Sequence, residues 1–341
     1  MKINNNKIKS LFLLSLVGSS LAKEEKPDNQ TEITHSNEIS FNSLPEMGTN
    51  FTHGKVTKRD NPKQNVLMAG SRIAIAEKWT DETTWINCTG SFVIVNSNTT
   101  DDGCNYGNDY GGFLTTLFCH PPLTDVAPQP PVTNWDGSVS LGNIFYETTF
   151  TGDVPYPDWK AIGEFLYISA NLANVKLLPF VPKTTDKGTT DFLPVIASSN
   201  PTAPGLSVCV YGAVSGYRCG HIIEVGAIVI APVPTLGGHL SLANLTKVNL
   251  GNKGLITGDF GAPVYSETQI GERTLAEALG HVSWIDNEAY QNQFFYYMPL
   301  EYALDMIKSD YSCAYSLLTY NETNAQEYDQ LLAQVEISAK N

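Results

Sequence analysis

The sequence predicts an all-β fold, because short strand-like segments recur along most of its length and a helical pattern appears only near its end. From Val66 onward, segments rich in β-branched and aromatic residues alternate with clusters of Gly, Pro, Asn and Asp. Short strands with turn signals at fairly regular spacing are typical of an antiparallel sandwich or barrel. The predicted strands are residues 72–76, 91–95, 112–117, 144–150, 161–168, 207–211, 221–230, 262–265 and 280–285.

The N-terminal segment, residues 1–22, has the features of a secretory signal peptide. Three lysines precede a short apolar stretch at residues 11–17, and small residues follow it. This stretch is too short to span a bilayer, which needs ~20 apolar residues. The alternative is a buried N-terminal helix. We expect a secreted, extracellular protein, and no later segment is apolar enough to cross a membrane.

Residues 23–65 are polar and poor in aromatic residues, which predicts a disordered leader or a short pro-segment. The dibasic pair Lys58-Arg59 near its end is either a processing site or a solvated basic pair. The composition changes at Val66, where the strand-like segments begin, so the main domain is expected to cover residues 66–310.

Two helical patterns lie at the end of the chain. In residues 299–308, a proline suits the first helical turn and leucine and isoleucine recur at helical spacing. A second amphipathic stretch, residues 325–335, predicts a further helix within a C-terminal tail, residues 311–341.

The charge of the chain limits its partners. The net charge is -14, whereas nucleic acids and anionic membranes bind proteins that carry basic patches. We therefore expect neither as a partner. The sequence contains no dinucleotide-binding loop or P-loop, and we expect no cofactor, no metal and a monomeric protein.

Secretion predicts disulfides and glycans. The chain has six cysteines and six Asn-X-Ser/Thr sites. Asn87 is a poor candidate because it precedes Cys88, and we expect glycosylation at Asn50, Asn98, Asn244 and Asn321.

Three motifs, in this order along the chain, resemble secreted chymotrypsin-fold serine proteases of the streptogrisin and α-lytic type. Cys88-Thr-Gly-Ser-Phe, followed by Gly112-Phe-Leu-Thr-Thr-Leu-Phe-Cys119, resembles the family's Cys-X-X-Gly-Phe strand and its Leu-Thr-Ala-Gly-His-Cys segment. Val208-Cys-Val-Tyr-Gly-Ala-Val-Ser-Gly-Tyr-Arg-Cys-Gly220 resembles Val-Cys-X-X-Gly-X-Thr-Thr-Gly-X-X-Cys-Gly. The third motif, Gly258-Asp-Phe-Gly-Ala-Pro263, stands where the family has Gly-Asp-Ser-Gly-Gly-Pro.

The resemblance covers roughly residues 70–308. Residues 280–284 resemble the strand that borders the substrate cleft, and residues 293–304 resemble the closing helix. It implies two six-stranded antiparallel β-barrels of the trypsin-like kind with a C-terminal helix.

The resemblance also implies two disulfides, Cys88–Cys119 and Cys209–Cys219. The family pattern does not predict the other two cysteines, Cys104 and Cys313, which remain to pair with each other. A Cys104–Cys119 bridge and a pair of free thiols are the alternatives.

The resemblance places the catalytic roles on residues that cannot all perform them. Phe118 stands at the position of the base, Asp158 at that of the orienting carboxylate and Phe260 at that of the nucleophile. Ser283 matches a serine that donates a hydrogen bond to the carboxylate. Acyl transfer needs a hydroxyl and a base within hydrogen-bond reach, and phenylalanine supplies neither. We expect Phe260 to pack on Phe118 over a retained Asp158. The alternative for Asp158 is a carboxylate in a loop, with no role in the site.

Other parts of the resemblance concern binding. Gly258 belongs to the oxyanion loop, and Val282, Ser283 and Trp284 correspond to the cleft strand that pairs with an extended peptide. The pocket beside Cys209–Cys219 can take a side chain.

The sequence therefore predicts a serine-protease homologue that lacks the catalytic serine and histidine and binds a peptide or protein ligand. One alternative is an active serine endopeptidase with rearranged catalytic residues, for example through His120. A secreted structural glycoprotein is the other.

Overall fold

The computed structural model describes twelve stretches of the chain, all within the unit His53–Asn341. They are residues 65–78, 81–96, 111–119, 131–147, 158–162, 164–185, 188–201, 203–233, 238–251, 254–286, 293–311 and 314–340. The expected signal peptide and all but the last residue of the leader lie outside them. So do Asn50, Asn98, Cys104, His120 and Cys313.

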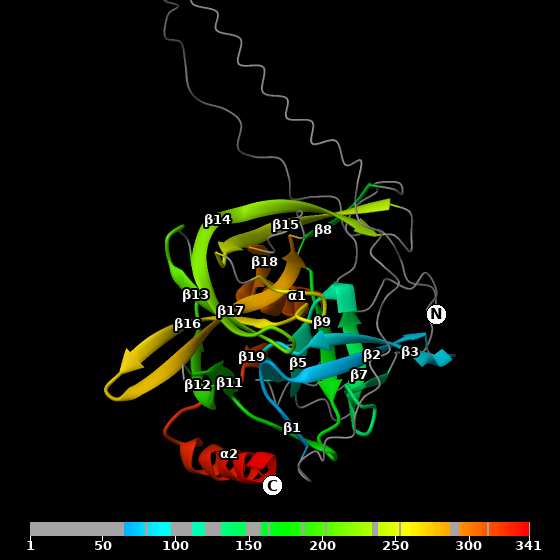
Figure 1. The fold of residues 1–341 in the computed structure, drawn as a ribbon. Helices are drawn as coiled ribbons and strands as arrows, with labels where there is room; N and C mark the ends of the chain where they lie inside the picture. The colour runs from blue at the N-terminus through cyan, green and yellow to red at the C-terminus, as the bar shows by residue number, and fades with distance from the viewer. Residues whose placement is uncertain are drawn as a thin grey trace, which may run out of the picture. The chain divides into compact units, whose positions relative to one another are not determined.

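The first large sheet forms a barrel from the N-terminal half of the domain (Figure 1). Its order is β19-β4-β5-β9-β7-β6-β2-β3. Its strands are β2 (Arg72–Lys78), β3 (Asp81–Thr89), β4 (Val93–Asn96), β5 (Gly111–Thr115), β6 (Pro131–Asn134), β7 (Ser140–Glu147), β9 (Leu166–Ala170) and β19 (Tyr315–Leu317).

Strands β3 and β4 act as one interrupted strand, because the residues between them keep their backbone hydrogen bonds. Gly90 N donates to Ser71 O at 2.8 Å, and Ser91 N donates to Leu114 O at 2.7 Å. This strand pairs with β2 at one end and with β5 at the other, so six strands close a ring and β19 extends it at the edge.

The second large sheet also closes on itself. Its path runs β11-β12-β17-β16-β13-β14-β15-β18, and an additional β17–β18 pairing closes six of these strands. Strands β11, β12 and β8 are attached outside the ring. The strands are β8 (Asp158–Ile162), β11 (Phe180–Thr184), β12 (Thr190–Ser198), β13 (Ser207–Gly212), β14 (Gly216–Val233), β15 (Gly238–Asn249), β16 (Pro263–Ile270), β17 (Arg273–Ile285) and β18 (Phe294–Pro299).

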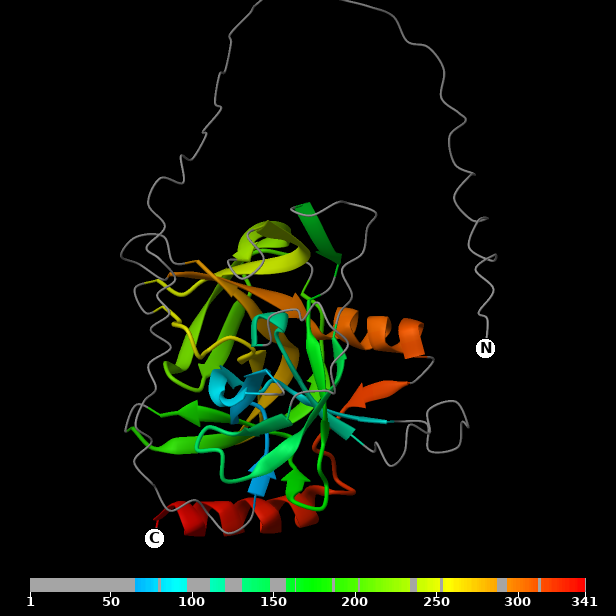
Figure 2. The same cartoon turned by 90° about the vertical axis from the view of Figure 1, so that its right-hand side faces the viewer.

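The predicted fold class is confirmed: the domain has two six-stranded antiparallel barrels and a C-terminal helix. This helix, α1 (Leu300–Tyr311), packs against β17, β18 and β19, as Figures 1 and 2 show. A short parallel pair, β1 (Asn65–Leu67) with β10 (Val175–Leu177), completes the sheets. The second helix, α2 (Ala325–Lys340), packs Leu331 and Leu332 against the buried cluster of Met68, Leu178 and Phe180.

Two segments differ from their expected structure. Residues 293–304 resemble a closing helix in sequence, but the structure has β18 up to Pro299 and only then α1. Aromatic side chains of β18 alternate between buried and half-buried positions, which suits a barrel wall. The C-terminal tail contributes β19 to the first barrel in addition to its helix.

Within the described residues, no helix has the length and apolar character needed to span a membrane.

Two of the expected glycosylation sites lie within the described residues. Asn244 is half-buried in β15 with a left-handed φ of 61°, a conformation that asparagine tolerates better than most residues. Asn321 is exposed just before α2, and its side-chain oxygen accepts hydrogen bonds from Thr323 N at 3.0 Å and Thr323 Oγ1 at 2.7 Å. Asn321 is therefore the more accessible of the two.

Both disulfides implied by the resemblance are present. Cys88–Cys119 ties β3 to the short 3₁₀ helix η1 (Leu117–Cys119), and Cys209–Cys219 joins β13 to β14. The described cysteines are all oxidised.

We predict that the two disulfides contribute unequally to stability. They join residues 31 and 10 positions apart, and a longer loop loses more entropy when it is closed in the unfolded chain. Replacing Cys88 and Cys119 by alanine should lower the free energy of unfolding by about 4 kcal/mol, and the Cys209/Cys219 pair by about 3 kcal/mol. Denaturant titration measures both, and the reverse order would contradict this account.

Candidate functional site

Three aromatic rings meet at the junction of the two barrels. Phe118 comes from η1, Phe260 from the loop before β16, and Trp284 from β17. The ring centroids of Phe118 and Phe260 are 5.7 Å apart, and Trp284 lies 5.4 Å from Phe118 and 6.3 Å from Phe260. All three side chains are half-buried. We call these three residues the aromatic trio.

The aromatic trio carries no acid–base chemistry. Phenylalanine neither accepts nor donates a proton, and the indole of Trp284 is only a hydrogen-bond donor. Tilted ring pairs at these distances stabilise each other by about 0.5–1.5 kcal/mol beyond the area they bury. The arrangement therefore offers a partly exposed apolar surface at the junction between the barrels.

The loop that carries Phe260 is fixed by the buried carboxylate of Asp259. Asp259 Oδ1 accepts from Val214 N at 2.8 Å and Ser215 N at 3.1 Å. Asp259 Oδ2 accepts from Ser215 Oγ at 2.5 Å and Ile256 N at 3.0 Å. Four neutral donors thus satisfy the carboxylate, which ties this loop to the β13–β14 turn.

Two glycines give the loop its shape. Gly258 has a φ of 101° and Gly261 a φ of 81°, in the region that favours glycine. A Cβ on Gly261 would lie 2.1 Å from Thr115 Oγ1 and 2.3 Å from Thr89 O. The oxyanion loop expected at Gly258 therefore keeps a backbone that other residues would not adopt.

Thr89 holds this loop from the first barrel. Its hydroxyl donates to Gly258 O at 2.8 Å and accepts from Ala213 N at 3.1 Å. Its amide donates to Phe260 O at 2.9 Å. The position of Phe260 therefore depends on contacts from both barrels.

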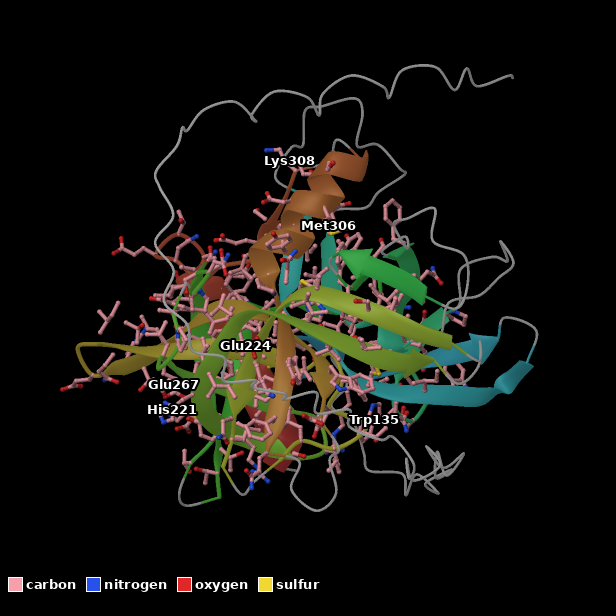
Figure 3. All side chains as sticks on the ribbon, turned by 90° about the horizontal axis from the view of Figure 1, so that it is seen from above. Trp135, His221, Glu224, Glu267, Met306 and Lys308 are labelled. Atoms are coloured by element: carbon pink, nitrogen blue, oxygen red, sulfur yellow. A yellow bond between two sulfur atoms is a disulfide. The ribbon has the colours of Figure 1, made fainter. Side chains whose placement is uncertain are left out.

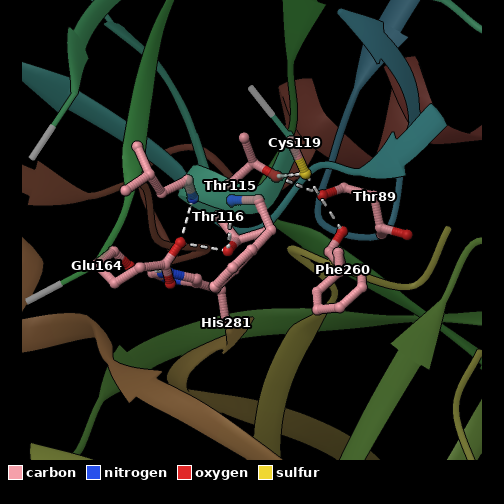
Figure 4. Close-up of polar contacts among 9 residues, drawn as sticks. Thr89, Thr115, Thr116, Cys119, Glu164, Phe260 and His281 are labelled. Carbon is pink, nitrogen blue, oxygen red and sulfur yellow. Dashed lines mark hydrogen bonds and ion pairs between the residues drawn. The ribbon is translucent and has the colours of Figure 1, made fainter. Parts of the chain in front are cut away.

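The carboxylate beside Phe118 belongs to Glu164, which the sequence analysis missed. Glu164 Oε1 accepts from Thr116 Oγ1 and from Leu117 N, immediately before Phe118 (Figure 4). The side chain is fully buried. Glu164 precedes aromatic Phe165 at the start of β9, and this acid–aromatic–strand pattern is the signal that could have found it.

Asp158, expected at this place, opens β8, where it pairs with His239 of β15 on the second barrel. Its side chain lies outside the described part of the structure. Asp158 lies in β8, whereas Glu164 lies just before β9 and accepts the backbone hydrogen bond that Leu117 N donates.

A second polar residue, His281 of β17, lies behind the trio. His281 Nε2 is 2.8 Å from Glu164 O and 3.7 Å from Glu164 Oε2. Both side chains are shielded from solvent, and His281 Nδ1 and Glu164 Oε2 have no hydrogen-bond partner within the described residues. This Glu–His pair faces the protein interior.

The three expected peptide-binding residues differ in accessibility. Val282 is buried, and its backbone is engaged by the loop: Gly261 N donates to Val282 O at 2.8 Å and Val282 N donates to Ala262 O at 2.9 Å. Ser283 is also buried, and its hydroxyl has no partner within the described residues, so it donates to no carboxylate there. Trp284 alone presents its side chain at the surface.

The fold and the site define a trypsin-like double barrel with an aromatic trio at the junction of the barrels. No protein-family model matches the chain, and no curated protein matches it in sequence. The chain is similar to solved structures of Thermobifida fusca protease A (18% identity, TM-score 0.46, covering 75% of this chain and 100% of that one) and Nocardiopsis protease (18%, 0.44, 74% and 100%). Cellulomonas bogoriensis chymotrypsin is also similar (16%, 0.44, 75% and 100%). These similarities carry no residue role to this chain.

We predict that Gly261→Ala is much more damaging than Gly137→Ala. Both glycines have a positive φ, but a Cβ on Gly137 meets no atom within 4 Å, whereas one on Gly261 meets Thr115 and Thr89. Gly137→Ala should cost about 1–2 kcal/mol, the cost of the left-handed backbone alone. Gly261→Ala should cost more than about 4 kcal/mol. Thermal or urea unfolding measures both, and equal costs would show that the loop yields easily.

Proposed function

We propose that this chain is a secreted, non-catalytic homologue of the serine proteases that binds a peptide or protein through the aromatic trio. The observation that supports this most is the contact between Phe118 and Phe260. These residues stand where the family has its base and its nucleophile, and the two rings are 5.7 Å apart.

Loss of either a nucleophile or its base costs an enzyme of this kind about a millionfold in turnover. Here both positions carry phenylalanine. Within the described residues, His281 and Ser283 supply no replacement, because both are shielded from solvent and a substrate carbonyl cannot reach them. His221 is exposed on β14.

The binding role is supported by the exposure of the trio. Half-buried aromatic residues that lie together on a rigid scaffold are typical anchors of protein interfaces. The net charge of -14 favours a partner with basic residues around an apolar anchor. Secretion fits the two disulfides, which persist in oxidising compartments.

The first test concerns catalysis. The purified full chain should neither react with an active-site fluorophosphonate probe nor cleave casein, because the trio offers no nucleophile. An active serine protease in the same assay is the positive control. Labelling or cleavage that is lost when the chain is unfolded would overturn the non-catalytic assignment.

The second test concerns binding. We predict that a peptide selected from a random library on the full chain will bind at least about tenfold more weakly to Phe118→Ala and Trp284→Ala variants, which corresponds to ~1.4 kcal/mol. Calorimetry reports the binding for every variant, and Trp284 fluorescence reports it for the variants that retain Trp284. The matched control is Ile230→Ala, which removes an apolar side chain that is 67% exposed on β14. An equal loss of peptide affinity in Ile230→Ala, or no loss of affinity in the trio variants, would place the binding site elsewhere.

A further inference from the structure

A small depression, not lined by any residue of the aromatic trio, lies where the segment before β2 meets β11, β12 and β13. Its volume is about 240 Å³. This is small for a ligand pocket, since such pockets commonly reach several hundred Å³, but it is enough for one amino-acid side chain or a small organic molecule. Met68, Pro182 and Phe192 give it an apolar wall.

Arg72 is the charged residue of this cavity, and the lining contains no acidic residue. Its guanidinium lies 4.8 Å from the ring centroid of Trp135. That ring is itself held by a 3.1 Å hydrogen bond from Trp135 Nε1 to Cys88 O. Within the described residues, no carboxylate pairs with Arg72, although the chain has 35 acidic and only 21 basic residues. A cation left unpaired in so acidic a protein is available to an external anion.

Tyr211 supplies a second donor to the cavity. Burial raises the pKa of its phenol, and the neighbouring Arg72 only partly opposes this effect. The hydroxyl is therefore protonated at neutral pH and can donate a hydrogen bond. No partner for it lies within the described residues.

The position of the Tyr211 ring depends on Gly70. This residue has a φ of 86°, and a Cβ on it would lie 2.8 Å from Tyr211 Cδ1 and 3.2 Å from Pro182 Cδ. The sequence thus keeps a glycine where any side chain would push the ring and the apolar wall aside. Gly70 therefore lets Tyr211 and Pro182 take the positions in which they line the cavity.

We propose that this cavity binds a small carboxylate with an apolar body, which Arg72 and Tyr211 hold by its carboxylate and the wall of Met68 and Phe192 holds by its apolar part. An arginine fork and a phenol are well suited to the two oxygens of a carboxylate. The volume suits one aromatic or branched aliphatic group. The ligand is either a free organic acid or the C-terminal residue of a peptide, which share this chemistry. The proposal does not depend on the function of the aromatic trio.

Calorimetry and ligand-observed NMR on the full chain test the proposal with three probes. N-acetyl-phenylalanine should bind, and its neutral amide should bind at least about tenfold more weakly, because the charge-assisted hydrogen bonds are lost. Phenylacetate distinguishes the two possible sources of the ligand. Equal affinities for phenylacetate and N-acetyl-phenylalanine indicate a free organic acid, and a weaker affinity for phenylacetate indicates a peptide C-terminus. Failure of both acids to bind would overturn the proposal.

Variants identify the site. Arg72→Gln and Tyr211→Phe remove the charge and the hydroxyl while retaining most of the side-chain volume, and each should weaken binding of the acids by about tenfold or more. The control is Lys308→Gln, which removes one positive charge from exposed Lys308 on α1, well apart from Trp135 in Figure 3. Unchanged affinity in both cavity variants, or an equal loss in the control, would show that the acids bind elsewhere or by net charge alone.

Discussion

The hydrogen bonds of Thr89 are the contact on which the arrangement of the site depends. This residue ends β3 in the first barrel, but its hydroxyl and amide bind Ala213, Gly258 and Phe260 of the second. Its own carbonyl accepts from Thr115 Oγ1 at 2.9 Å. Because Thr89 is fully buried, each of these groups would otherwise be an unsatisfied polar atom, at a cost of about 1–3 kcal/mol each. The barrels are therefore fixed to each other at the point where the aromatic trio forms.

The aromatic trio and the polar residues behind it differ in their exposure to solvent. The aromatic rings are partly exposed, whereas Glu164 and His281 lie wholly inside. The interior retains a carboxylate that binds the backbone next to Phe118, so that segment keeps a defined conformation. The partly exposed rings carry no group that takes up or releases a proton. Such a surface suits recognition better than proton transfer.

The features that short sequence motifs encode can be predicted from the sequence alone. The family resemblance implies the two disulfides that the structure contains, and it singles out Phe118 and Phe260, whose rings lie 5.7 Å apart. Glu164 is harder to find, because Asp158 is likewise an acid followed by an aromatic residue, Trp159, as Glu164 is by Phe165. The hydrogen bond that Leu117 N donates to Glu164 is visible only in the folded structure. The Arg72 cavity is invisible in the sequence, since its walls come from four segments that only folding brings together. The strand β18 also escapes prediction, because its proline and the following helix dominate the local pattern.

The hydrogen bonding of Asp259 bears on what holds the loop that carries Phe260. Its two oxygens accept four bonds from Val214, Ser215 and Ile256, all of them neutral donors in the folded domain. Three of these donors belong to backbone amides, so most of the anchor does not depend on which side chains stand at those positions. The identity of the residue at position 260 can therefore vary while the backbone that presents it keeps its course.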